Sequence, residues 1–331
     1  MKIAFYGTKP YDRMFFEPLS KEYGYEVRFI EELLNEHSII MAQGCDGVCV
    51  FVNDEVNADI IDRLYEMGIK AILLRSAGYN NVDLKAAKGK LRVMRVPSYS
   101  PEAVAEFAMA LLLSVNRKTH RAYVRTREFN MNIQGLMGTD LHGKTAGVVG
   151  TGKIGRAMIR ILKGFGMHVL AYDVYPDNSL DIDYVELDEL LERSDVISLH
   201  CPLTKETYHI IDETSIKKMK QGVYLVNTSR GALIDTAAVI EELKSGDTFA
   251  GVAFDVYEEE DDLFYEDHSD EPVKDDVIAR LMSFPNVIIT SHQAFFTKEA
   301  LRAIAIVTLE NAKNLEEGKE LMNEVIYGVN A

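Results

Sequence analysis

The chain has 331 residues, of which 47% are hydrophobic, and this length and composition suit two globular domains. No apolar run approaches the ~20 residues that span a bilayer, and the opening MKIAFYGT predicts a first strand rather than a signal peptide. The net charge of −16 argues against a nucleic-acid or anionic-membrane partner. Three cysteines (Cys45, Cys49 and Cys201) form neither a disulfide framework nor a zinc spacing, so we expect a reduced, cytoplasmic protein without a metal site.

Residues 1–100 alternate short apolar runs with segments of helical periodicity, such as Asn57–Met67. This alternation predicts a parallel β-sheet with helices on both faces, and ligands bind such sheets beyond the carboxyl ends of the strands. The predicted strands are Lys2–Tyr6, Tyr25–Ile30, Gly47–Val52, Ala71–Leu74 and Arg92–Val96.

One of these strand ends, Arg75–Tyr79, is rich in small side chains. The backbone N–H groups of Ser76, Ala77 and Gly78 could hold a carboxylate there. Taken alone, however, the segment fits an ordinary turn between a strand and a helix better.

A long apolar helix is predicted after Pro101, through EAVAEFAMALLLSVNRKTHRAY at residues 102–123. A proline at the first helical position and acids in the first turns suit the geometry and the dipole of a helix start. We expect this helix to lead from a first structural unit into a second, with residues 131–143 as a loop.

The stretch TAGVVGTGKIGRAMIRILKGFGMHVLAYD has the pattern strand, glycine turn, helix and strand. Gly150, Gly152 and Gly155 form a G-x-G-x-x-G, in which glycine permits the tight turn, the approach of a pyrophosphate and the close packing of the helix. The helix that begins at Lys153 and Ile154 would offer unpaired N–H groups to the phosphates. This combination predicts a dinucleotide-binding unit.

Asp173 ends the second strand of this unit, where a carboxylate can accept hydrogen bonds from an adenosine ribose. The same carboxylate would repel the 2′-phosphate of NADP, so we predict NAD as the cofactor. Arg156 lies at the start of the helix and could contact the pyrophosphate, but we expect Asp173 to set the preference.

Beyond Asp173, each further apolar run is followed by polar residues. The predicted strands are Asp195–Leu199, Tyr224–Asn227, Gly251–Phe254 and Val287–Thr290. They end, in that order, at His200-Cys201-Pro202, Thr228-Ser229-Arg230-Gly231, Asp255 and Ser291-His292. The final helical stretch, Thr297–Glu317, is expected to cross back to the first unit.

A bound nicotinamide implies hydride transfer, and reduction of a 2-keto acid needs a cation for the carboxylate and a proton donor for the carbonyl oxygen. Arg230 suits the first task because a guanidinium binds a carboxylate through two hydrogen bonds. His292 or His200 suits the second, since histidine titrates at pH ~6.5 and a nearby carboxylate favours its charged form. The glutamates at 258–260 are adjacent, so spacing alone leaves the choice of that carboxylate open.

Seven ordered motifs, spread over essentially the whole chain, resemble those of the D-specific 2-hydroxyacid dehydrogenase family, and most closely its fermentative D-lactate branch. The motifs are RSAGYNNVDL at 75–84, VPSYSPEAVAE at 96–106, GKTAGVVGTGKIG at 143–155, SLHCPLT at 198–204, VNTSRGALID at 226–235, FDVYEEEDDLFYED at 254–267 and SHQAFFT at 291–297.

The resemblance implies roles for the residues at matching positions. It implies Arg230, Glu260 and His292 as catalytic residues, with Glu260 supporting His292 as the proton donor. The residues implied for the cofactor are Gly150, Gly152, Lys153, Ile154, Gly155, Asp173, His200, Cys201, Pro202, Thr228, Ser229 and Asp255, the last near the nicotinamide. Those implied for the substrate are Ser76, Ala77, Gly78, Phe51, Tyr99, Phe296 and Arg230.

The resemblance also implies an α/β architecture of two doubly wound parallel-sheet domains with the site in the cleft between them. A flavodoxin-like substrate domain would take residues 1–100 and 298–331, and a Rossmann NAD domain would take residues 101–297. The expected activity is the NADH-dependent reduction of pyruvate to D-lactate, in a homodimer or homotetramer. The alternatives are a broader D-2-hydroxyacid dehydrogenase for phenylpyruvate, 2-ketoisocaproate or hydroxypyruvate, and a NAD-sensing corepressor on the same fold.

Phe51, Tyr99 and Phe296 are candidates to enclose the methyl group of the substrate, although each could be ordinary core instead. Three large rings around one methyl group would leave little volume for an isobutyl or benzyl group, and forcing one in typically costs ~1–3 kcal/mol. We therefore predict a preference for pyruvate over the bulkier keto acids.

Overall fold

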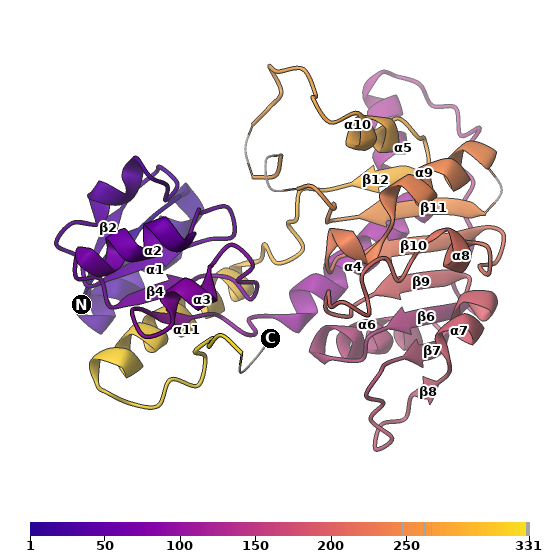
Figure 1. Ribbon diagram of the computed structural model, residues 1–331. Helices are drawn as coiled ribbons and strands as arrows, with labels where there is room; N and C mark the ends of the chain where they lie inside the picture. The colour runs from indigo at the N-terminus through magenta and orange to yellow at the C-terminus, as the bar shows by residue number, and fades with distance from the viewer. Residues whose placement is uncertain (247, 261–262, 266, 329–331) are drawn as a thin grey trace. The chain divides into compact units, whose positions relative to one another are not determined.

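The structure is a computed structural model that describes the chain except for residues 247, 261–262, 266 and 329–331. It divides into two compact units (Figure 1). The first unit consists of Met1–Ser100 and the chain from Phe296 onward, and the second is Pro101–Phe295. Phe296 and Thr297 thus group with the first unit, two residues before the boundary expected from the sequence.

The first unit contains a five-stranded sheet in which every pairing is parallel. The strand order is β2-β1-β3-β4-β5, the flavodoxin-like order of a doubly wound sheet. The strands are β1 (Lys2–Phe5), β2 (Glu26–Phe29), β3 (Gly47–Val50), β4 (Ala71–Leu74) and β5 (Arg92–Met94). All five predicted strands are confirmed, with ends that agree within two residues.

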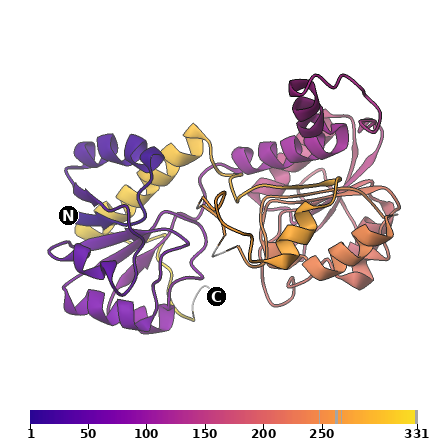
Figure 2. The ribbon, with the colours of Figure 1, turned by 90° about the horizontal axis from the view of Figure 1, so that it is seen from above.

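Helices cover both faces of this sheet, because its inner strands β1, β3 and β4 are apolar and buried along nearly their whole length. The helices are α1 (Pro10–Tyr23), α2 (Ala58–Glu66), α3 (Leu84–Ala87) and α11 (Lys298–Glu316), with a 3-10 turn, η1 (Ser38–Ala42). Helices α1 and α11 pack together along one face, and α2 and α3 lie along the other (Figure 2). The returning helix α11 begins where the Thr297 side chain accepts a hydrogen bond from the N–H of Ala300, at 3.1 Å.

The second unit contains a seven-stranded parallel sheet with the order β12-β11-β10-β9-β6-β7-β8. The order reverses between β6 and β9, which creates the switch point at which dinucleotides bind in Rossmann folds. The strands are β6 (Thr145–Val149), β7 (His168–Tyr172), β8 (Asp183–Tyr184), β9 (Val196–Leu199), β10 (Val223–Asn227), β11 (Phe249–Phe254) and β12 (Val287–Ile289). The two-residue strand β8 was not predicted, since so short a run carries no periodicity.

Alternate residues of these strands enter two separate cores, as the period of a strand requires. Val148 of β6 packs in the core that includes Ala105 and Met158, whereas the next residue, Val149, packs in the core that includes Leu190. One face is covered by α4 (Pro101–Arg117) and α6 (Lys153–Gly164). The remaining elements are α5 (Thr119–Arg127), α7 (Leu187–Arg193), α8 (Glu213–Ile216), η2 (Gly231–Leu233), α9 (Thr236–Ser245) and α10 (Asp276–Met282).

The prediction of one continuous helix over 102–123 was wrong. Lys118 adopts the left-handed backbone conformation, with φ of 51°, and separates α4 from α5. The Asn116 side chain accepts from the N–H of Thr139 and donates to its carbonyl oxygen, both at 2.8 Å. The predicted loop therefore folds back onto the end of α4, and this contact between distant residues has no signal in the helical periodicity.

Candidate active site and dinucleotide cradle

The turn at the carboxyl end of β6 is tightly packed. Gly150 has a φ of +94°, and a Cβ on this residue would lie 2.6 Å from the backbone nitrogen of Cys201. A Cβ on Gly155 would lie 2.0 Å from the carbonyl oxygen of Gly150. Only glycine fits at these two positions, which bring the start of α6 against the ends of β6 and β9.

Gly152 lies in open space by contrast. A Cβ on it would meet no atom of the described residues within 4 Å, and no side chain caps the start of α6 at this residue. The N–H groups of Lys153 and Ile154 begin the helix here, where the helix dipole favours an anion. The residues present therefore fit the pyrophosphate of a dinucleotide.

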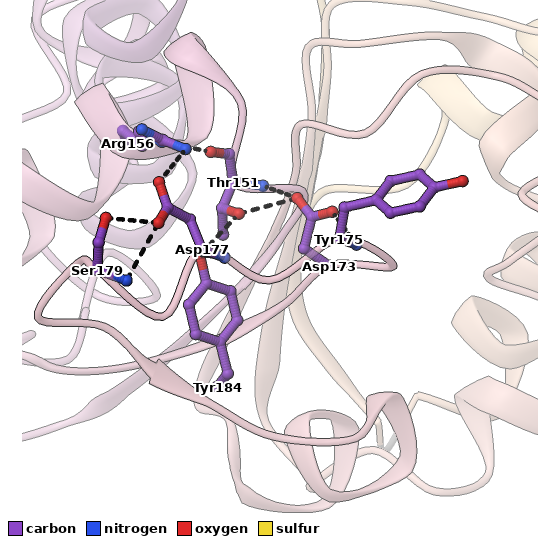
Figure 3. A network of polar contacts seen from close by, with 7 residues as sticks. All are labelled: Thr151, Arg156, Asp173, Tyr175, Asp177, Ser179 and Tyr184. Carbon is purple, nitrogen blue, oxygen red and sulfur yellow. Dashed lines mark hydrogen bonds and ion pairs between the residues drawn. The ribbon is translucent and has the colours of Figure 1, made fainter.

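The carboxylate of Asp173 lies directly after β7 and is held by neighbouring donors (Figure 3). Its Oδ2 accepts from the N–H and the hydroxyl of Thr151, at 2.6 and 2.8 Å, and its Oδ1 accepts from the N–H of Tyr175 at 2.9 Å. Burial opposes ionisation, but these hydrogen bonds and the charge of Arg156 outweigh it and lower the pKa of Asp173. The site thus presents a fixed negative charge, as expected for an acid that binds a ribose.

His200, Cys201 and Pro202 follow β9 on the other side of the switch point. Burial lowers the pKa of His200 to about 4, so its imidazole is neutral near neutral pH. The Nε2 atom of His200 lies 2.8 Å from the hydroxyl of Ser198, and its Nδ1 has no hydrogen-bond partner among the residues that the structure describes. A buried neutral ring is poorly suited to donate a proton, which separates His200 from His292.

The loop after β10 orients Arg230. The Ser229 hydroxyl donates to the carbonyl oxygen of Leu199 at 3.0 Å, which ties this loop to β9, and Thr228 lies buried beside it. Arg230 donates from Nη1 to the carbonyl oxygen of Ser229 at 2.7 Å. No other partner of its guanidinium occurs in the described part of the chain, so the remaining N–H groups are available for a carboxylate.

Gly231 joins this loop to the segment that contains the acidic partner. A Cβ on Gly231 would lie 2.0 Å from the carbonyl carbon and oxygen of Tyr257, so only glycine permits this approach. The N–H of Tyr257 in turn donates to Oε2 of Glu260 at 3.1 Å. The backbone next to Arg230 therefore packs on the turn that fixes Glu260.

His292 and Glu260 form a hydrogen-bonded pair. Nδ1 of His292 lies 2.8 Å from Oε1 of Glu260, and the two side chains are 22% and 20% exposed, so both are shielded yet reachable. Nε2 of His292 has no hydrogen-bond partner among the described residues. The arrangement can hold a protonated imidazole and present Nε2 to a ligand.

Asp255 organises the loop that carries His292. It is fully buried, and its carboxylate accepts from the Thr290 hydroxyl at 2.5 Å and from the N–H groups of Gln293 and Ala294 at 2.9 and 2.7 Å. Burial outweighs these hydrogen bonds and raises the pKa of Asp255. Its carboxylate thus positions the loop that contains His292, and the expected place of Asp255 near the nicotinamide stays a prediction.

The neighbouring glutamates have different partners. Oε1 of Glu258 lies 2.7 Å from Nε2 of His209, and its Oε2 accepts from the N–H of Thr236 at 3.0 Å. Glu259 is exposed. Only Glu260 contacts His292 among the three, which answers the question that their spacing left open.

The substrate candidates Ser76, Ala77 and Gly78 lie in the first unit, immediately after β4. The Ser76 hydroxyl donates to the carbonyl oxygen of Gly78 at 2.8 Å, and Arg95 donates to that of Ala77 at 3.0 Å. These contacts fix the turn through its carbonyl oxygens. The carboxylate-binding role of its N–H groups stays a prediction.

The aromatic candidates also belong to the first unit. The buried Arg75 guanidinium lies 5.0 Å from the ring centroid of Phe51, so this half-buried ring takes part in a packing contact. Phe296 is 47% exposed, and its ring meets that of Tyr11 edge-on with centroids 4.8 Å apart. Tyr99 is partly buried. Their enclosure of a methyl group stays a prediction.

Two residues at the site carried no prediction. The Tyr265 hydroxyl donates to the carbonyl oxygen of His292 at 3.2 Å, with the two rings 6.1 Å apart. His209 pairs with Glu258, as described above. Tyr265 belongs to a motif of the resemblance, but neither its spacing nor its residue type distinguishes it from the aromatic residues around it.

The described residues contain no helix long and apolar enough to cross a membrane. The same residues contain no group of three or more histidine, cysteine, aspartate or glutamate side chains that could hold a metal ion.

The Rossmann strand order, the glycine turn at its switch point and the His292–Glu260 pair together define a NAD-dependent dehydrogenase. Comparison with known proteins agrees with this class. Residues 109–294 match the family model described as "D-isomer specific 2-hydroxyacid dehydrogenase, NAD binding domain". The chain belongs to the D-isomer specific 2-hydroxyacid dehydrogenase family.

One relative and two solved structures are similar over nearly the whole chain. The D-lactate dehydrogenase of Escherichia coli is 51% identical over 98% of this chain and 100% of its own. The apo-structure of D-lactate dehydrogenase from Escherichia coli superposes with a TM-score of 0.91 at 49% identity, covering 98% and 100% of the two chains. A structure of the pyruvate reductase of Chlamydomonas reinhardtii gives a TM-score of 0.93 at 42% identity, with 98% of both chains covered.

Proposed function

We propose that this enzyme reduces pyruvate to D-lactate with NADH. The observation that carries the proposal is the His292–Glu260 pair, with 2.8 Å between Nδ1 and Oε1, on the same unit as the dinucleotide cradle. The names of the similar proteins, D-lactate dehydrogenase and pyruvate reductase, support pyruvate as the keto acid.

Arg230 would bind the carboxylate of the substrate. A guanidinium donates two parallel hydrogen bonds to a carboxylate, which fixes its plane as well as its position. Only Nη1 of Arg230 has a partner within the described residues, the carbonyl oxygen of Ser229, so the side chain is oriented without being fully engaged. This leaves the donors that such a fork requires.

His292 would donate the proton to the carbonyl oxygen. NADH supplies the hydride when it is bound, and the developing alkoxide needs a proton donor within hydrogen-bonding reach. Glu260 binds Nδ1, so the proton on Nε2 of His292 is the one available for transfer. The carboxylate of Glu260 stabilises the imidazolium before the transfer and fixes the ring orientation.

Asp173 and the start of α6 would hold the NAD. Gly152 leaves room beside the N–H groups of Lys153 and Ile154 for the phosphates, and Asp173 presents a carboxylate to the ribose. The other residues expected to contact NAD directly follow the neighbouring strands β9 and β10. They are His200, Cys201, Pro202, Thr228 and Ser229.

The alternative is a broader D-2-hydroxyacid dehydrogenase. One observation favours it: Phe51 packs against the buried guanidinium of Arg75, so one of the three rings expected to restrict the pocket has another structural role. With fewer rings around the methyl group, a larger side chain would be accepted at a lower cost.

The test is the oxidation of NADH with a panel of keto acids: pyruvate, 2-ketoisocaproate, phenylpyruvate and hydroxypyruvate. We expect kcat/KM for pyruvate to exceed the values for the bulkier acids by ~5- to 150-fold, as ~1–3 kcal/mol of steric cost implies. Equal values for phenylpyruvate and pyruvate would favour the broader enzyme. Absence of turnover with every acid would favour a NAD sensor.

A further inference from the structure

Arg156 is linked through Thr151 to Asp173, the acid expected to bind the ribose. Its Nε donates to the carbonyl oxygen of Thr151 at 2.8 Å, and the N–H and hydroxyl of the same Thr151 donate to Asp173 (Figure 3). The Arg156 guanidinium and the Asp173 carboxylate, which is expected to bind the ribose, therefore both contact Thr151. Arginine is the residue that accommodates the 2′-phosphate in NADP-dependent Rossmann folds.

A second carboxylate, that of Asp177, forms an ion pair with the Arg156 guanidinium. Nη2 of Arg156 donates to Oδ2 of Asp177 at 3.2 Å. The other oxygen of Asp177 accepts from the hydroxyl and the N–H of Ser179, at 2.6 and 3.1 Å. The backbone N–H of Asp177 also donates to the Tyr184 hydroxyl at 3.3 Å, and that hydroxyl donates to Thr151 Oγ1 at 3.0 Å.

These contacts hold Asp177 in place and ionised. Hydrogen bonds from Ser179, and after them the charge of Arg156, lower the pKa of Asp177. The side chains of Arg156 and Asp177 are 42% and 35% exposed, and ion pairs this accessible contribute little to stability. The effect of the pair is instead local, because it neutralises and orients a cation beside Asp173.

We propose that Asp177 is a second determinant of the preference for NAD over NADP. It acts through Arg156, by holding a guanidinium that would otherwise be free to bind the 2′-phosphate. Asp173 rejects the phosphate by its own negative charge, and Asp177 rejects it by engaging the cation that would compensate for that charge. The inference rests on NAD binding in this unit and is independent of the identity of the keto acid.

The test measures the dissociation constants of NADH and NADPH by nicotinamide fluorescence, without any keto acid. Asp177→Asn keeps the shape of the side chain and can still accept from Ser179, but it removes the charge. We expect its affinity for NADPH to rise by ~5- to 20-fold at low salt, because the released guanidinium can donate to the 2′-phosphate, with NADH changed by less than ~2-fold. The increase should shrink as ionic strength rises.

Two further variants separate the proposed mechanism from a structural role. In Arg156→Gln/Asp177→Asn the increase should disappear, because the cation that binds the phosphate is missing. Glu102→Gln is the matched control, since it removes the partner of Arg160, a second exposed arginine of α6, with 3.1 Å between Nη2 and Oε1. This control should leave both affinities unchanged.

Three results would contradict the role proposed for Asp177. An unchanged NADPH affinity in Asp177→Asn, or an increase that persists without Arg156, would overturn the proposal. Equal weakening of NADH and NADPH would show that Asp177 only shapes its turn, which would also overturn it. Because no keto acid is present, an error in the substrate assignment would alter none of these measurements.

Discussion

Nδ1 of His292 lies 2.8 Å from Oε1 of Glu260, and Oε2 of the same carboxylate accepts from the N–H of Tyr257. Both oxygens of Glu260 thus have a hydrogen-bond partner, which holds this carboxylate in place beside Nδ1 of His292. His292 itself has a left-handed backbone, with φ of 51°, a conformation that persists in a non-glycine residue only where its surroundings enforce it. Here Asp255 enforces it, because its carbonyl oxygen accepts from the N–H of His292 at 2.7 Å.

Glu260→Gln tests the role of this pair. The amide no longer stabilises the imidazolium by its charge, so we expect the fall of pyruvate reduction at rising pH to move to lower pH. Glu258→Gln is the matched control, since Glu258 pairs with His209 instead. The pH profile of kcat/KM for each variant gives the answer. A shift in the control but not in Glu260→Gln would show that the wrong glutamate has been assigned.

Arg230 should be sensitive to geometry as well as charge. Arg230→Lys keeps the positive charge but loses the planar fork, whereas Arg230→Gln loses both. We expect KM for pyruvate to rise in both variants and kcat/KM to fall by ~10- to 100-fold in the lysine variant and further in the glutamine variant. Steady-state kinetics at saturating NADH measure this. Wild-type kinetics in both variants would refute the carboxylate-binding role.

Substrate selection by the aromatic residues is a separate prediction. If Tyr99 and Phe296 enclose the methyl group, then Tyr99→Ala and Phe296→Ala should remove a steric cost that affects bulky keto acids and not pyruvate. The ratio of kcat/KM for phenylpyruvate over pyruvate should rise by ~5- to 150-fold, as relief of ~1–3 kcal/mol implies. An unchanged ratio in both variants would place these rings outside the pocket.

The positions of most strands along the chain, and the polar residues at their ends, were predictable because both follow from the residues of each segment. Apolar runs of five residues, glycine turns and the acid after β7 each have a direct physical cause in their own segment. The His292–Glu260 pairing was not accessible from spacing, because three adjacent glutamates look alike until the turn after Tyr257 directs one of them. The same holds for Arg156 and Asp177, whose contact depends on how the chain returns after β7.

The break at Lys118 and the burial of Asp255 have the same origin. Helical periodicity continues through Lys118, but Asn116 binds the returning loop at Thr139 and the helix ends. Asp255 follows a strand like the other site residues, yet its carboxylate turns inward to the N–H groups of Gln293 and Ala294. The end of the helix and the burial of Asp255 both depend on residues more than 20 positions away in the sequence, so a local sequence pattern cannot predict them.

His200 should make stability depend on pH. The unfolded chain binds a proton on this histidine at pH ~6.5, whereas the folded chain resists it until the pKa of about 4. The unfolded state therefore binds more protons between these values, and acidification favours unfolding. Stability attributable to His200 should be present above pH ~6.5 and should fall by roughly 3 kcal/mol as pH drops to about 4.

Urea unfolding at several pH values measures this loss. The difference in pH dependence between wild type and His200→Gln isolates the contribution of one histidine. His37→Gln is the control, since its side chain is 87% exposed and removing it should leave the slope as it is. Parallel curves for wild type and His200→Gln would mean that His200 accepts a proton in the folded state.

The most direct test of the proposed function is the product formed from pyruvate and NADH by the wild-type enzyme and by His292→Gln. We expect D-lactate from the wild type, formed one for one with the NADH consumed. In His292→Gln, kcat should fall by ~10²–10⁴-fold through loss of the proton donor, with NADH affinity retained. Formation of L-lactate, consumption of NADH without lactate, or an undiminished kcat in His292→Gln would contradict the proposed function.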